Sequence, residues 1–124
     1  MFTVRAEEVF SAAHFLSHYH GKCEKLHGHN YKVRVTARGS SLDEGGMLLD
    51  FGLLKKALRA VTDELDHTSL NDHPAFADGS PSAENIAKFV YDGVCARLPG
   101  AGISLVEVFE TGENRATYSP DPER

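Results

Sequence analysis

The sequence predicts an α+β fold in which a four-stranded antiparallel sheet carries two helices on one face. Residues 2–14 and 27–37 alternate between apolar and polar side chains, which is typical of strands with one buried face. Two later segments repeat apolar residues every three or four positions, the spacing of amphipathic helices. Strands and helices are grouped along the chain and do not alternate, which favours an antiparallel sheet.

The first two strands are expected to form a hairpin around a loop at residues 15–26. Even-numbered positions of residues 2–14 are mostly apolar, and the exception, Glu8, is expected at a β-bulge. In residues 27–37 the odd-numbered positions, among them Tyr31, Val33 and Val35, form the apolar face. The even-numbered positions of this second strand are polar, so we expect them to face away from the helices.

The two helices follow, each with a start signal. Asp50 is expected to cap a helix whose apolar stripe runs from Phe51 to Leu65. Ser80 is expected to cap the second helix, with Pro81 in its first helical position. Two shorter strands, Ile103–Glu110 and Arg115–Tyr118, are expected to complete the sheet. The polar tail, residues 119–124, is expected to fray.

Composition limits the class of protein. The chain has 124 residues, of which 41% are hydrophobic and 25% charged, so residues 1–124 are expected to form one globular domain with a buried core. The net charge of −5 gives no basic surface for nucleic acid or an anionic membrane, so neither is expected as a partner. Without a signal-peptide pattern or a membrane-spanning apolar run, a cytoplasmic protein is expected, with Cys23 and Cys95 as free thiols.

Three histidines are expected to converge on a metal ion. His27 and His29 are two residues apart on a strand, so both side chains lie on the same, apolar face. His14 ends the neighbouring strand on its own apolar face, opposite the other two if the strands pair around the loop. Three imidazoles with a vacant position fit a catalytic zinc site. The remaining histidines, His18, His20 and His73, are expected to be solvated loop residues.

Cys23 lies four residues before His27, and its spacing leaves two roles open. It could complete a closed site of three histidines and one cysteine. It could equally stand beside the metal as a thiolate, because the cation and the flanking Lys22 and Lys25 would lower the pKa of the thiol. A closed site would indicate a non-catalytic, zinc-stabilised binding module.

A second polar cluster favours catalysis. Asp66 and His67 end the first helix, where such residues often serve only as helix termination but also form a common pair for proton transfer. Glu110 continues the apolar parity of its strand, so its carboxylate is expected to face the covered side, where it can bind a ligand with adjacent N–H donors. A structural zinc site needs neither feature.

Taken together, the segments "FSAAH", "CEKLHGHNY", "LLDFGLLKK", "LDHTSLND", "SPSAENIA" and "VEVFET" resemble the 6-pyruvoyltetrahydropterin synthase family in their order, over roughly residues 2–118. The three residues between Cys23 and the His-Gly-His motif look most like the bacterial branch that makes 6-carboxy-5,6,7,8-tetrahydropterin for queuosine and 7-deazapurine biosynthesis. The resemblance implies the tunnelling fold (T-fold), in which subunits join edge to edge into a β-barrel. It also implies a homohexamer, a dimer of trimers, with active sites between subunits.

The resemblance also implies roles for single residues. His14, His27 and His29 correspond to the ligands of one Zn²⁺ per subunit, and Cys23 to a catalytic cysteine that is not a ligand. Asp66 and His67 correspond to the acid/base pair. Glu110 corresponds to the carboxylate that anchors the pterin, and Ser82 to a threonine near it.

The implied reaction converts 7,8-dihydroneopterin triphosphate to 6-carboxytetrahydropterin, with loss of triphosphate and acetaldehyde. The alternative within the family is the 6-pyruvoyl product, which needs no carbon–carbon cleavage. Phe15 stands where relatives often carry arginine, so the residues that hold the triphosphate, and whether a second metal such as Mg²⁺ helps, stay open.

Overall fold

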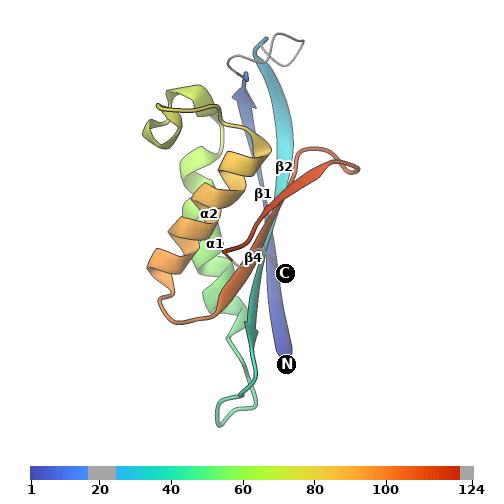
Figure 1. The fold of residues 1–124 in the computed structure, drawn as a ribbon, viewed down its shortest axis with the longest axis vertical. Coiled ribbons are helices and arrows are strands. Elements are labelled where there is room, and N and C mark those ends of the chain that lie inside the picture. Colours follow the sequence, from blue (N-terminus) through green and yellow to red (C-terminus); the bar gives the residue numbers. More distant parts are fainter. Residues whose placement is uncertain (17–24, 121–124) are drawn as a thin grey trace.

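The computed structural model describes residues 1–16 and 25–120, which form one five-stranded sheet with two helices on one of its faces (Figure 1). The long strands β1 (Phe2–His14) and β2 (His27–Gly39) form an antiparallel hairpin. β4 (Ile103–Phe109) pairs with β2, and β5 (Arg115–Tyr118) with β4, both antiparallel. The predicted fold class and the four predicted strands are confirmed.

The fifth strand was not predicted. β3, Thr68–Ser69, has only two residues and pairs in parallel with Ala12 and Ala13 of β1, so the strand order is β3-β1-β2-β4-β5. A two-residue strand is too short to show an alternating pattern. Short 3₁₀ turns follow it at Leu70–Asp72 and Pro74–Phe76.

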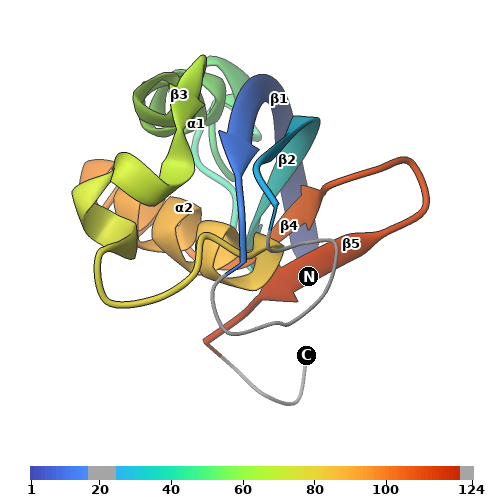
Figure 2. The ribbon, with the colours of Figure 1, turned by 90° about the horizontal axis from the view of Figure 1, so that it is seen from above.

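The helices α1 (Phe51–Leu65) and α2 (Ala83–Arg97) cover the same face of the sheet, which Figure 2 shows from above. The core between them is apolar and closely packed: Tyr31, Val33 and Val35 from β2 are fully buried, as are Leu58 of α1 and Val90 of α2. Asp50 caps α1 by accepting a hydrogen bond from the amide of Gly52, as predicted. Within the described residues, no helix has the length and apolar character that crossing a membrane requires.

Two local predictions were wrong. β1 and β2 pair without interruption past Glu8, so there is no bulge there. The Glu8 carboxylate is accommodated on the helix side because Lys55 and Arg59 of α1 lie 3.5 and 3.2 Å from it. The start of α2 also differs: Ser82, and not Ser80, is the N-cap, and its hydroxyl accepts a hydrogen bond from the amide of Asn85.

Candidate active site and metal centre

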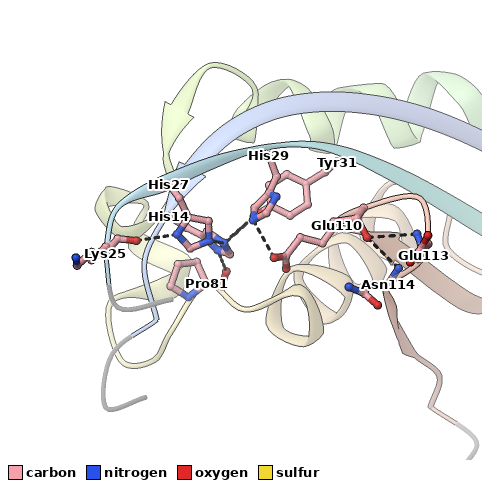
Figure 3. Close-up of polar contacts among 10 residues, drawn as sticks. His14, Lys25, His27, His29, Tyr31, Pro81, Glu110, Glu113 and Asn114 are labelled. Atoms are coloured by element: carbon pink, nitrogen blue, oxygen red, sulfur yellow. Dashed lines mark hydrogen bonds and ion pairs between the residues drawn. The ribbon is translucent and has the colours of Figure 1, made fainter. Parts of the chain in front are cut away.

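The β1–β2 hairpin brings the three predicted histidines together. His14, the last residue of β1, lies directly opposite His27, the first residue of β2, and His29 lies opposite Ala12. All three rings point to the helix-covered side of the sheet and meet at its end (Figure 3). Their ring centroids are 4.5 to 5.3 Å apart.

Main-chain carbonyls determine which ring nitrogens face one another. Nδ1 of His14 donates to the carbonyl of Pro81 at 2.8 Å, and Nδ1 of His27 donates to the carbonyl of Lys25 at 2.7 Å. The Nε2 atoms of His14 and His27 therefore face each other, only 3.0 Å apart. Two imidazole lone pairs at this distance repel unless a proton or a cation lies between them, so the pair fits a metal ion.

His29 supplies a third donor. Its Nε2 atom is buried and has no hydrogen-bond partner of acceptable geometry among the described residues. Burial lowers the pKa of His29, and His14 and His27 lower it further while Glu110 opposes them, so the ring tends to be neutral, as a metal ligand must be. One ligand atom from each of the three histidines and from Glu110 lies within 4.8 Å of all the others, so these residues could hold a metal ion.

Glu110 follows β4 directly, and its carboxylate faces inward as predicted. Its Oε1 atom lies 2.8 Å from Nε2 of His29. The backbone at this position is fixed because the Glu110 amide donates to the carbonyl of Asn114, across the turn to β5. Beside the carboxylate is a hollow of about 200 Å³, whose lining includes Glu84 and Arg115.

Asp66 and His67 form the predicted pair at the end of α1. Oδ2 of Asp66 lies 3.0 Å from Nδ1 of His67, while Oδ1 accepts a hydrogen bond from the amide of Ser11. The His67 amide donates to the Ser11 carbonyl at 2.6 Å, which holds His67 at a left-handed φ of 58°. The His67 side chain is 82% exposed and, with His29, lines a hollow of about 430 Å³.

Two other predicted residues, Phe15 and Ser82, follow His14 and Pro81 of this centre directly in the chain. Ser82 lies one residue after Pro81, and its hydroxyl caps α2 by accepting the hydrogen bond from the Asn85 amide. Phe15 is held in place by Asn71, whose amide group donates to the Phe15 carbonyl and accepts from its amide. The predictions for Cys23, Lys22, His18 and His20 fall outside the described residues.

His73 is not the solvated residue that we expected. Its side chain is 19% exposed, and its ring packs against Phe76 and Phe89. Its Nδ1 atom accepts a hydrogen bond from the Ala75 amide, which leaves Nε2 to face Glu64 of α1. The short turns that surround it gave no periodic signal in the sequence.

Sequence reasoning missed two groups of the metal centre. The Pro81 carbonyl orients His14, and a carbonyl leaves no trace in a sequence. Tyr31 is fully buried, and its hydroxyl oxygen lies 3.2 Å from Nδ1 of His14. Burial raises the pKa of Tyr31, and Glu110 adds to this, so the phenol stays protonated. Its position two residues after His29, on the same strand face, was the available signal.

Comparison with known proteins supports the family resemblance over nearly the whole chain. Residues 3–121 match the family described as 6-pyruvoyl tetrahydropterin synthase. The 6-carboxy-5,6,7,8-tetrahydropterin synthase of Bacillus subtilis is 39% identical, over 96% of this chain and 86% of that protein. The human 6-pyruvoyl tetrahydrobiopterin synthase is also 39% identical, over 79% of this chain and 70% of that protein.

The fold agrees as well. The solved structure of 6-pyruvoyl tetrahydropterin synthase from Caenorhabditis elegans superposes with a TM-score of 0.88 at 30% identity, covering 97% of this chain and 96% of that one. The sheet with two helices on one face is therefore the T-fold of these enzymes. With sequence, fold and histidine cluster in agreement, this chain belongs to the 6-pyruvoyl tetrahydropterin synthase family.

Proposed function

We propose that the protein is a zinc-dependent 6-carboxy-5,6,7,8-tetrahydropterin synthase. It converts 7,8-dihydroneopterin triphosphate to 6-carboxytetrahydropterin and releases triphosphate and acetaldehyde. The observation that carries the proposal is the facing pair of Nε2 atoms of His14 and His27, which calls for a cation. The bacterial relative of that name, which covers 96% of the chain, supports the choice of reaction.

The residues of the metal centre bind and orient the substrate in this proposal. His14, His27 and His29 hold the zinc, which when bound supplies a Lewis acid for the hydroxyls of the substrate side chain. The Glu110 carboxylate accepts the paired N–H groups of the pterin ring, which matches its inward direction. Ser82 flanks the ring from the start of α2.

Proton transfer falls to Cys23, Asp66 and His67. Cys23, as thiolate, removes the side-chain proton. The pKa of Asp66 is lowered, chiefly by the hydrogen bond from the Ser11 amide, so this carboxylate stays ionised at neutral pH. An ionised Asp66 beside Nδ1 holds that proton on His67, which leaves Nε2 to accept or deliver a proton.

The 6-pyruvoyl product is the second candidate, because the human 6-pyruvoyl tetrahydrobiopterin synthase is also 39% identical, over 79% of this chain. Mass spectrometry of the pterin made by the zinc-loaded protein from 7,8-dihydroneopterin triphosphate separates the two. The proposal predicts a product with one side-chain carbon, whereas the second candidate predicts three. Unchanged substrate would contradict both.

The proposal includes assembly and location. We place the reaction in the cytoplasm, in a homohexamer whose active sites lie between subunits. The exposed His67 supports a shared site, because its ring has room to meet groups of a second subunit.

A further inference from the structure

The carboxylate of Glu110 lies within the histidine cluster of the metal centre. Its Oε1 atom is 2.8 Å from Nε2 of His29, yet this nitrogen has no hydrogen bond of acceptable geometry in the described part of the chain. The oxygen is therefore near the nitrogen but out of line with an N–H bond. The two atoms are therefore not paired as donor and acceptor, and they belong to the group of four residues that could hold a metal ion.

The number and type of the ligand atoms also fit a single metal ion. Three imidazoles and one carboxylate are four donors, the number that a closed tetrahedral zinc site takes. Within the described residues, His29 is the only ion-pair partner of the Glu110 carboxylate, and no lysine or arginine competes for it. A half-buried carboxylate without a cationic side chain is well compensated by a metal ion.

We propose that Glu110 is the fourth ligand of the metal in the substrate-free protein and that the pterin ring displaces it. The displacement rests on the proposed function, whereas the ligand role does not. The same carboxylate cannot bind the metal and the N–H groups of the ring at full strength, so arrival of the ring opens the fourth position. The fourth position of the metal is thus open only while a pterin ring is bound beside it.

Metal affinity gives the first test. Zinc affinity is measured by competition with a chromophoric chelator for the wild type, Glu110→Gln, and Glu113→Gln as a matched control. Glu113 is an exposed carboxylate three residues away in the same turn. We expect Glu110→Gln to weaken zinc binding by at least about tenfold and Glu113→Gln to leave it unchanged. Equal affinities of the wild type and Glu110→Gln would overturn the proposal.

The cobalt-substituted protein distinguishes a ligand from a neighbouring charge. Azide is added as a ligand for an open position on the metal. If Glu110 occupies the fourth position, azide should not change the visible spectrum of the wild type but should change that of Glu110→Gln. Glu110→Asp keeps the charge on a shorter arm, and its backbone is fixed by the bond to Asn114, so azide should bind there too. A wild type that binds azide as readily as these variants would contradict coordination by Glu110.

A pterin tests the displacement separately. 6-Methylpterin carries the ring without side-chain hydroxyls, so it can draw Glu110 away without replacing it on the metal. Added to the cobalt-substituted wild type, it should change the spectrum and permit azide binding. If affinity and azide behave as expected but 6-methylpterin has no effect, the ligand role of Glu110 stands, and the displacement and the pterin part of the proposed function are wrong.

Discussion

At the scale of single residues, the histidine ring nitrogens carry most of the chemistry. Strand parity was sufficient to predict that His14, His27 and His29 meet, because the side chains of a hairpin alternate regularly. It could not predict which nitrogen of each ring faces the centre. That choice depends on the carbonyls of Pro81 and Lys25, which are brought there by loops. Main-chain groups have no sequence signature, so this part of the site needs the structure.

Two substitutions separate a ligand from a catalytic neighbour. Cys23→Ala should keep one zinc per chain and lose turnover, because in the proposed mechanism the thiolate moves a proton and does not bind the metal. His27→Ala should lose the metal itself, since it removes one of the two facing Nε2 atoms. Metal analysis of the purified variants, combined with a turnover assay, measures both. Loss of zinc from Cys23→Ala would show that the cysteine is a ligand.

The face of the sheet opposite the helices carries an ion-pair network that should respond to acid. Nε of Arg34 donates to Glu7 at 2.6 Å, and this hydrogen bond is the main cause that lowers the pKa of Glu7 from 4.5. Because the pKa of Glu7 is lower in the folded than in the unfolded protein, ionised Glu7 stabilises the fold at every pH above its unfolded-state pKa. This contribution is lost as the pH falls through the folded-state pKa.

Glu7→Gln should therefore unfold at lower urea concentration at neutral pH, and its stability should fall less than that of the wild type below pH 4.5. Urea titrations at several pH values measure this difference. Glu113→Gln serves as the control, because its carboxylate has no ion-pair partner among the described residues. Parallel curves for the wild type and Glu7→Gln would mean that the bond to Arg34 contributes nothing.

At the scale of elements, the long periodic segments were predictable and the short or tertiary features were not. β1, β2 and both helices follow from their apolar periodicity. The two-residue strand β3 has no period to detect. The apparent misfit at Glu8 was resolved by Lys55 and Arg59, which come from α1 about fifty residues later in the chain. A pattern within one strand cannot reveal such a partner, so the predicted bulge was wrong.

The contact between α1 and α2 depends on a glycine. A Cβ atom at Gly93 would lie 2.8 Å from Cγ2 of Val61, closer than real side chains approach. Gly93→Ala should therefore destabilise the protein by about 1–3 kcal/mol, although alanine is the better helix former. Denaturant unfolding measures this change. Adding Val61→Ala should recover part of the loss, and a Gly93→Ala variant more stable than the wild type would contradict the close packing.

At the scale of the whole molecule, the sheet ends on two strands that can pair further. Within the described residues β3 covers only Ala12 and Ala13 of β1, and β5 forms the opposite edge. Open edges of this kind invite strand pairing with other chains. They support edge-to-edge assembly into a barrel, which the resemblance to the T-fold family had implied from the sequence.

The assembly should be visible in solution. Native mass spectrometry of the zinc-loaded protein should give a mass about six times that of the 13.6 kDa chain. Gentle dissociation should release trimers, since these close the barrel. A stable single chain with full turnover would contradict active sites shared between subunits.

In the proposed reaction, this fold with its metal centre carries out elimination followed by carbon–carbon cleavage. The most direct measurement is the ratio of acetaldehyde to triphosphate released from 7,8-dihydroneopterin triphosphate by the zinc-loaded protein. We expect one acetaldehyde for each triphosphate from the wild type, and neither product from His27→Ala. Triphosphate without acetaldehyde would show a 6-pyruvoyl-forming enzyme, and release of neither product from the zinc-loaded wild type would contradict the proposed reaction altogether.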